Sequence, residues 1–266
     1  MFNTILSLVC AVTMALALCV YTTMAPAQQA VVNGLVSYWT FDAADIDGDT
    51  VSDVFGDNDG TITGTPKIVA GKVGEGLAFD GTEDYVNYDV FDLSDQGTVE
   101  AYIKPAAFGT ILTILASGSK TCNTCYWHFR VFRNAKLEVT QCNNDQWDWL
   151  TGSTTLSETT WYHVAVVSNG TSYKLYVDGQ EEGLTITGGA NSGDWFGDTD
   201  KRDNITIGVF KRAALDDFFN GIIDEVRIYK RALSANEIKQ NMNAEGLAVS
   251  TSKTLTLTWG EIKISR

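Results

Sequence analysis

A stretch rich in aspartate and glycine, "DIDGDTVSDVFGDNDG" (residues 45–60), is the first segment whose side chains could do chemistry. An EF-hand calcium loop needs oxygen ligands at its first, third and fifth positions, Gly at the sixth and a bidentate Glu at the twelfth. Counted from Asp45, the sixth position holds Thr50 and the twelfth holds Gly56. The stretch is therefore not an EF-hand, and we expect a turn-rich connection between the first strands.

Three cysteines, Cys122, Cys125 and Cys142, lie in the middle of the chain, and His128 completes a C-x2-C-x2-H spacing of the kind that binds zinc. In a regular strand His128 points away from the side of Cys125, which argues against zinc. If the segments on either side of Asn134 form a hairpin, Cys142 lies across from the residue after Cys125. We therefore expect a disulfide from Cys142 to Cys125 or Cys122, with one thiol left over.

Aromatic side chains in two predicted loops could stack on the apolar faces of sugar rings while nearby carboxylates accept the hydroxyls. These segments are "DQWDWL" (145–150), which places two tryptophans on one side of an extended chain, and "SGDWFGDTD" (192–200). The candidate ligand contacts are Trp147, Trp149, Asp194, Trp195 and Phe196. The alternative, in which these rings pack into the core, stays open.

Composition restricts the partners and the compartment. The chain has 266 residues and a formal net charge of -14, which argues against nucleic acid or an anionic membrane as partner. Residues 1–27 carry no charge and end in Ala-Pro-Ala, so we expect an export signal cleaved after Ala27, with an uncleaved membrane anchor as the alternative. Residues 28–266 would then be exported to the periplasm, the cell surface or the medium.

Short runs of alternating apolar and polar residues, separated by Gly, Asp and Asn, follow residue 34 and predict an all-β sandwich. The predicted strands are 35–42, 76–81, 84–91, 98–105, 110–117, 125–132, 136–142, 161–168, 172–179, 204–210 and 221–229. No helical pattern interrupts them, which excludes a parallel βαβ fold.

One short helix is predicted late in the chain, in "LSANEIKQNM" (233–242), where Ser234 and Glu237 have the spacing of a capping box. We expect one domain over residues 28–243 and a tail over 244–266, which forms either a terminal strand or a loosely held segment.

Asp224 is the least expected carboxylate in the sequence. In "GIIDEVRIY" (221–229), strict alternation places Asp224 on the same face as Ile222, Val226 and Ile228. A buried carboxylate without partners is costly, so we expect Asp224 to meet a cation or backbone N–H donors.

Four stretches together resemble the laminin-G-like jelly roll of the concanavalin A-like lectin and glucanase superfamily. They are "GLVSYWTFD", "GLAFDGTEDYV", "TWYHVAVVSNGTSYKLYVDGQ" and "FFNGIIDEVRIYKRALSANEI". The resemblance covers about residues 34–243 and implies two antiparallel sheets packed face to face. It also favours turns within residues 45–60, because the family places an Asp, a Gly-Asn or Asn-Asp pair and a Gly-Thr there.

The resemblance further implies a structural calcium ion, Ca2+, held between the terminal strands. Its ligands would be the carboxylates of Asp42 and Asp224 and the backbone carbonyl of Gly81. The alternative is that backbone N–H groups satisfy Asp224.

The glucanases of the superfamily use two glutamates in a pattern like E-x-D-x-x-E, and no segment of this chain has that pattern. His163 matches a framework position of the family. The sequence therefore predicts a non-catalytic module that binds a carbohydrate or an extracellular protein. A glycoside hydrolase and a purely structural or adhesive surface protein remain as alternatives.

Overall fold

The computed structural model describes residues 28–91, 93–143, 145–244 and 246. The expected signal segment, residues 1–27, and nearly all of the expected tail lie outside these residues. Within the described part of the chain, no helix has the length and apolar character needed to span a membrane.

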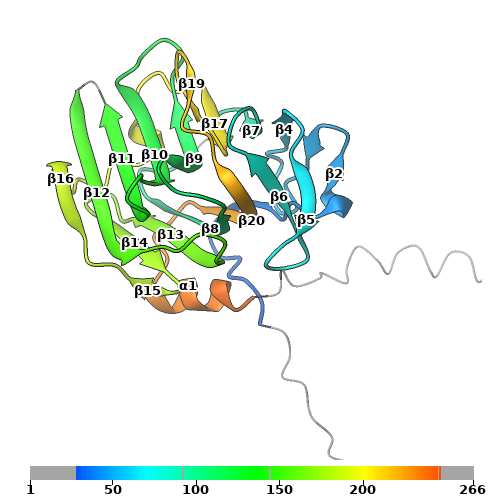
Figure 1. The fold of residues 1–266 in the computed structure, drawn as a ribbon. Coiled ribbons are helices and arrows are strands. Elements are labelled where there is room, and N and C mark those ends of the chain that lie inside the picture. The colour runs from blue at the N-terminus through cyan, green and yellow to red at the C-terminus, as the bar shows by residue number, and fades with distance from the viewer. Residues whose placement is uncertain (1–27, 92, 144, 245, 247–266) are drawn as a thin grey trace, which may run out of the picture.

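Two large antiparallel sheets pack face to face as a jelly-roll sandwich (Figure 1). Sheet A has the order β15 (Gln180–Glu181), β14 (Tyr173–Val177), β13 (Tyr162–Ser168), β8 (Gly97–Pro105), β20 (Asn220–Tyr229), β6 (Glu75–Asp80) and β5 (Lys67–Ala70), and β1 (Leu35–Trp39) also pairs with β20. Sheet B has the order β16 (Thr185–Gly189), β12 (Gln146–Thr155), β11 (Lys136–Asn143), β10 (Cys125–Val131), β9 (Leu112–Gly118), β17 (Asn204–Ile207), β7 (Tyr85–Tyr88), β4 (Gly60–Thr63), β3 (Thr50–Val51) and β2 (Ile46–Asp47).

The smaller elements are a hairpin of β18 (Phe210–Lys211) and β19 (Leu215–Asp216), two 3-10 turns, η1 (Ala43–Asp45) and η2 (Phe196–Asp198), and the helix α1 (Ala235–Met242). The predicted strands all coincide with strands of the sandwich, and the predicted capping box of α1 is present, with Ser234 and Glu237 bonding reciprocally. The predictions of an all-β sandwich and of a short C-terminal helix are confirmed.

Strand alternation builds the core between the sheets. On β8 the side chains of Val99, Ala101 and Ile103 point inward, and on β10 Trp127 and Phe129 do the same. Burial of such apolar side chains on both inner faces holds the sheets together.

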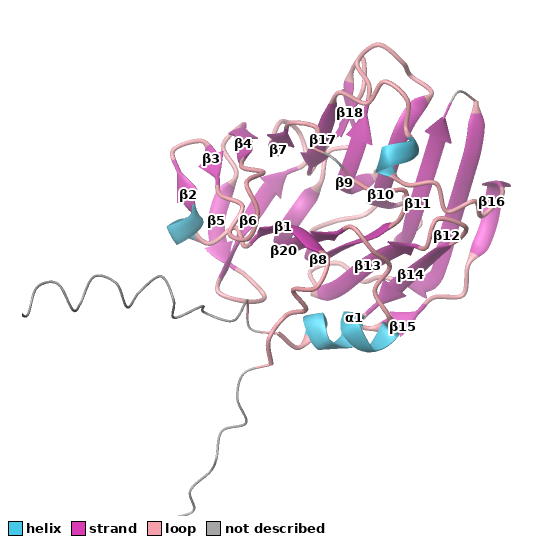
Figure 2. Ribbon diagram, turned by 180° about the vertical axis from the view of Figure 1, so that it is seen from behind, coloured by secondary structure: helices cyan, strands magenta, loops and turns pink. Residues whose placement is uncertain are grey.

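The two outer faces differ in what covers them. The helix α1 lies against sheet A (Figure 2), where a second apolar cluster includes Ile238, Leu233, Tyr38 and Val167. On sheet B the hairpin β18–β19 lies over part of the outer face, where Phe210 stacks on His128. A hollow beside this hairpin, lined by residues of β11, β12 and β16, offers a place where a ligand could dock.

Residues 45–60 form turns and short strands, as predicted. Asp53 organises them, because its Oδ1 accepts hydrogen bonds from the backbone N–H groups of Tyr38 and Gly56, at 2.9 and 2.8 Å. Gly48, with a φ of 59°, makes the tight turn between β2 and β3.

The expected alternation along β20 is wrong. The register shifts between Asp224 and Arg227, and Glu225 has a φ of 55°, which is the conformation of a β-bulge. Asp224 consequently pairs with Tyr102 on the outer side of sheet A, and the core side is taken by Ile223 and other apolar residues of β20.

Candidate functional site

The open outer face of sheet B is built by the register of four strands. Arg130 of β10 lies between Thr113 of β9 and Glu138 of β11, and Glu138 lies opposite Thr151 of β12. Residues directly opposite one another in antiparallel strands point to the same face. A row of polar side chains therefore crosses the sheet. Trp149, two residues before Thr151, lies on the same face of β12.

An ion pair between Arg130 and Glu138 lies at the centre of this row. The Arg130 Nε and Nη2 groups donate to Glu138 Oε2 at 3.1 and 3.0 Å, and the two side chains are 9% and 3% exposed. Trp149 Nε1 donates to the same oxygen at 2.9 Å, and Thr151 Oγ1 donates to Oε1 at 2.7 Å. One carboxylate thus fixes the guanidinium and the indole ring together.

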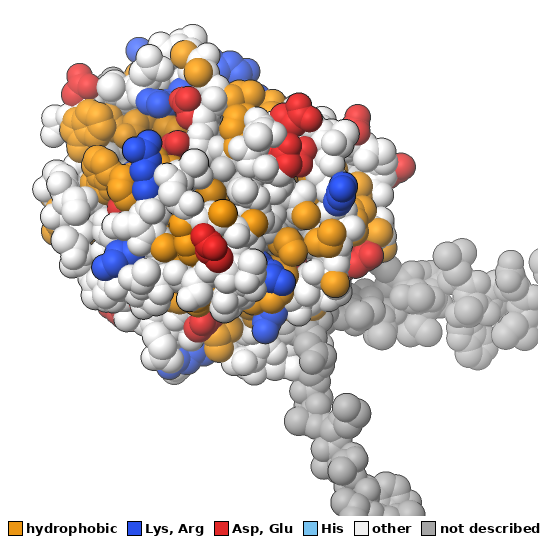
Figure 3. Space-filling view, in the orientation of Figure 1, with side chains coloured by type: hydrophobic (Ala, Val, Ile, Leu, Met, Phe, Trp, Pro, Cys, Tyr) orange, Lys and Arg blue, Asp and Glu red, His pale blue; other side chains and the backbone are white. Residues whose placement is uncertain are grey.

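Two aromatic rings stand above the ion pair. The guanidinium carbon of Arg130 lies 5.2 Å from the ring centre of Phe132 and 5.2 Å from that of Trp149. The two rings meet edge to face, with their centres 5.9 Å apart. They line a hollow of about 360 Å³ together with threonine hydroxyls, among them Thr185 and Thr187. Hydrophobic side chains, with basic ones between them, gather over strands β10 to β12 (Figure 3).

A second hollow lies further along β12, around Trp147. This ring is 47% exposed and shares the outer face with Trp149, as the sequence predicted. Both rings belong to a strand and not to a loop, because residues 146–155 pair with β11 and β16. Asp194 lies at the rim, where its Oδ2 accepts a hydrogen bond from Gln141 Nε2 at 2.7 Å.

Trp195 and Phe196 are not ligand contacts. Both side chains are fully buried and stack on one another with ring centres 4.6 Å apart. Trp127 packs against both of them from β10. The alternative of core packing is therefore correct for this pair, because the segment that follows β16 turns inward at η2.

The hairpin β18–β19 closes the neighbouring part of the face. Phe210 stacks on His128 with ring centres 4.3 Å apart, and it also contacts Tyr126. Burial holds the pKa of His128 well below its ordinary value, so this imidazole is neutral. With His128 covered by Phe210, the accessible chemistry of the face is that of the two hollows along β12.

The sequence did not identify Arg130, Phe132 and Glu138 as site residues. Alternation within the strands on either side of Asn134 places Arg130 and Glu138 on the same face, and their hairpin register places them opposite one another. That signal was present in the sequence, but it becomes visible only when the two strands are paired.

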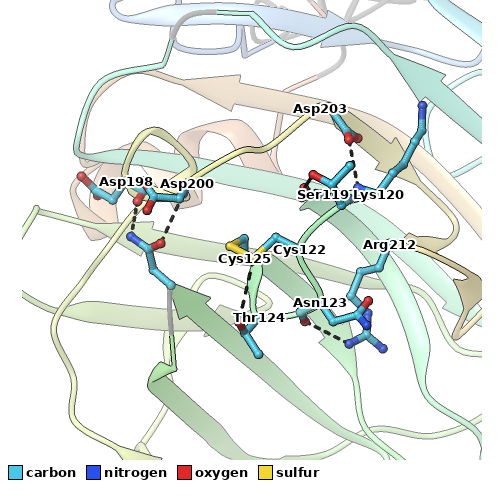
Figure 4. The surroundings of a disulfide bond; sticks show 12 residues. Ser119, Lys120, Cys122, Asn123, Thr124, Cys125, Asp198, Asp200, Asp203 and Arg212 are labelled. Carbon is cyan, nitrogen blue, oxygen red and sulfur yellow. Dashed lines mark hydrogen bonds between the residues drawn. A yellow bond between two sulfur atoms is a disulfide. The ribbon is translucent and has the colours of Figure 1, made fainter.

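The predicted disulfide of Cys142 is wrong. Cys122 and Cys125 form the bond (Figure 4). Among the described cysteines, Cys142 is a buried free thiol. Cys142 does pair with Tyr126, as the hairpin register predicted. This register itself places the side chains of Cys125 and Cys142 on opposite faces of sheet B, where they cannot meet. A bond between Cys122 and Cys125 also removes two thiolates from any zinc set.

Comparison with known families decides which family the chain represents. The family model described as the concanavalin A-like lectin/glucanases superfamily matches residues 80–239. The chain belongs to this superfamily. A comparison with curated protein sequences gives no match.

Solved structures of low sequence identity share the fold of this superfamily member. One is domain 4 of AbnA, an extracellular GH43 arabinanase from Geobacillus stearothermophilus, in complex with arabinotriose. It is 22% identical, with a TM-score of 0.61, over 78% of this chain and 98% of that one.

Sialidases supply two further neighbours. The CBM40 of the Ruminococcus gnavus IT-sialidase, bound to α2,3 sialyllactose, is 18% identical, with a TM-score of 0.52, over 66% of this chain and 96% of that one. The Trypanosoma rangeli sialidase in complex with sialic acid is 17% identical, with a TM-score of 0.59, over 80% of this chain but only 33% of its own.

The superfamily's implied calcium ion can be tested against the side chains at the end of β20. Asp224 is fully buried, and its Oδ2 accepts hydrogen bonds from the N–H groups of Lys72 and Val73 at 2.7 and 3.0 Å. Its Oδ1 has no hydrogen-bond partner within the part of the chain that the structure describes. Burial raises the pKa of Asp224 to about 7, and the charge of Asp42 contributes to this shift. Asp42 accepts from the N–H of Glu75 at 2.6 Å, so both carboxylates meet one glycine-rich loop.

Small residues make room for both carboxylates. A Cβ on Gly71 would lie 2.6 Å from Asp224 Oδ2, and one on Gly74 would collide with Asp42 Oδ1. Gly81 does not fit the predicted set, because it lies beside Asn220, which pairs with Asp80 at the start of β20. Within the described residues no three His, Cys, Asp or Glu side chains are arranged to hold a metal, so an ion here would need backbone carbonyl ligands as well.

Proposed function

We propose that this protein is an exported, non-catalytic module that binds carbohydrate on the open outer face of sheet B. The observation that carries the proposal is the hollow beside Trp149, where an indole ring is fixed by Glu138 and faces a wall of threonines. Sugar rings stack their C–H faces on such a ring and exchange hydrogen bonds with hydroxyl groups.

Rigidity of the site supports this role. The one N–H group of the Trp149 side chain, Nε1, donates to Glu138. The guanidinium of Arg130 packs against the rings of Phe132 and Trp149. A ring that is already ordered loses little conformational freedom when a ligand docks, which favours affinity.

The neighbours in the superfamily agree with this function. The titles of two of them name bound saccharides, arabinotriose and sialyllactose, on domains that this chain matches over almost their whole length. An extracellular protein partner is the competing ligand class.

The carboxylates of the face support a binding role over hydrolysis. A glycosidase needs one carboxyl group to protonate the leaving oxygen and a second one as nucleophile or base. Glu138 accepts hydrogen bonds from Arg130, Trp149 and Thr151, and among the described residues it is the only acidic one that lines its hollow. Both of its carboxylate oxygens are engaged by these donors, which suits a positioning role.

Export is supported by the uncharged start of the sequence and by the disulfide between Cys122 and Cys125. Disulfides persist in oxidising compartments outside the cytosol.

We also propose a structural calcium ion between Asp42 and Asp224. The orphaned Oδ1 of Asp224 supports it, because a buried oxygen without a partner is costly. The N–H groups of Lys72 and Val73 bond to Asp224 and so hold their loop beside this carboxylate. The backbone carbonyls of the same loop would be further ligands of the ion. When bound, the ion would neutralise two carboxylates that otherwise repel one another.

A glycan panel tests the function. Binding should be found for one carbohydrate class, without release of reducing ends, and Trp149→Ala should abolish it. The matched control is Phe55→Ala, because Phe55 is an exposed aromatic residue in the turns of residues 45–60. Release of reducing ends from a bound polysaccharide would show a hydrolase, and unchanged binding by Trp149→Ala would exclude this face.

A further inference from the structure

The two hollows of sheet B lie in line along a single strand edge. Trp147 and Trp149 are two residues apart on the outer face of β12, which separates them by about 7 Å along the strand. This separation exceeds the width of one sugar ring. The hollow at Trp149 and the hollow at Trp147 both continue onto the neighbouring edge strand β16 or the segment that follows it.

Glycines keep the path between the two hollows clear. Gly188 pairs with Trp149, and a Cβ added there would lie 3.5 Å from the Trp149 Cβ, which is an ordinary contact. A larger side chain would therefore fit the backbone but would stand beside the indole ring. Gly189 differs, because a Cβ there would overlap the carbonyl oxygen of Trp147, and its φ is 67°. Of these two glycines, only Gly188 has a backbone conformation that other residues adopt without strain.

The acidic hollow beside Trp147 opens toward the other face of β12. Asp148 and Gln141 line this hollow and pair with one another, and alternation points both side chains away from the outer face that carries the two rings. At this end of the outer face, the contact offered to a ligand is therefore the ring of Trp147, which is 47% exposed.

We infer that the ligand is an oligosaccharide of two or more sugar units that lies along β12, with one ring on Trp149 and another on Trp147. This inference rests on the proposed carbohydrate-binding function. It adds the direction of the chain and its minimum length. Trp149 provides the principal contact, because its ring is the more enclosed, and Trp147 adds to the affinity only for ligands that reach it.

The test is calorimetric titration of the full exported chain with arabinose, xylose and glucose oligomers of one to six units, and with galacturonic acid oligomers of the same lengths. One series should bind, with affinity rising about fivefold to tenfold once the ligand reaches the second ring. Trp147→Ala should remove this rise, so that longer oligomers of that series bind no more tightly than the shortest one that binds.

Gly188→Leu should weaken oligosaccharide binding about tenfold without lowering the melting temperature, because its side chain narrows the path beside Trp149. Gly183→Leu is the matched control, since Gly183 is exposed and a Cβ there has only distant neighbours at 3.8 Å. Affinity that does not depend on chain length, or a length series untouched by Trp147→Ala, would overturn this inference while leaving carbohydrate binding in place. Failure of every oligomer to bind would contradict the proposed function and this inference together.

Discussion

Replacing Glu138 by Ala should destabilise the protein more than any ordinary surface substitution. The change leaves the Arg130 guanidinium, 9% exposed, without the carboxylate that receives two of its N–H groups. It also removes the acceptor for Trp149 Nε1 and Thr151 Oγ1. Removing one partner of a buried ion pair costs about 3–5 kcal/mol. We expect a loss in this range in the free energy of unfolding.

Urea denaturation at pH 7, followed by circular dichroism, measures this loss. Glu181→Ala is the control, because Glu181 pairs with Lys174 at 2.9 Å with both side chains about half exposed. That pair should contribute less than about 1 kcal/mol. The double variant Arg130→Met/Glu138→Leu should recover most of the stability, because it leaves no unpaired charge. A loss below about 1 kcal/mol for Glu138→Ala would refute the claim that this ion pair is a buried support of the site.

Three further predictions concern the rest of the chain. Non-reducing peptide mapping should find Cys122 linked to Cys125, and Cys142 should react with alkylating agents only after unfolding; a bond to Cys142 would contradict the register of β10 and β11. The melting temperature should climb with added Ca2+, since a ligand that binds only the folded form raises the free energy of unfolding by about 2.7 kcal/mol at a hundredfold excess over Kd. Asp224→Asn should flatten this climb, whereas Asp49→Asn should leave it unchanged. The reverse pattern would place the ion in residues 45–60. N-terminal sequencing of the exported protein should begin at Gln28, whereas an intact Met1 in the membrane fraction would show an anchor.

Short-range patterns were enough to predict the fold. Alternation and turn residues located the strands of both sheets, and Ser234 and Glu237 marked the start of α1. Residues 146–155 were missed as a strand, because the mixture of glutamine, tryptophan and aspartate at their start resembles a loop. Alternation failed at Asp224 because a bulge adds one residue to the strand, and no local pattern marks a bulge at a non-glycine residue.

The candidate site depended on pairings that a sequence does not display. Trp147 and Trp149 could be selected from residue type alone, but Trp195 and Phe196 have the same composition signal and lie in the core. Arg130 and Glu138 gain their role from the register between β10 and β11 and from the ring of Trp149 on β12. The predicted disulfide failed for the same reason, since the hairpin pairs Cys142 with Tyr126 and so puts Cys142 and Cys125 on opposite faces.

The most direct test of the central claim is a crystal structure of the protein with the longest oligosaccharide that binds it. The account predicts one sugar ring stacked on Trp149 at van der Waals distance, about 4 Å, and the chain continuing along β12 toward Trp147. A sugar bound on the outer side of sheet A, or at a loop distant from β12, would contradict it.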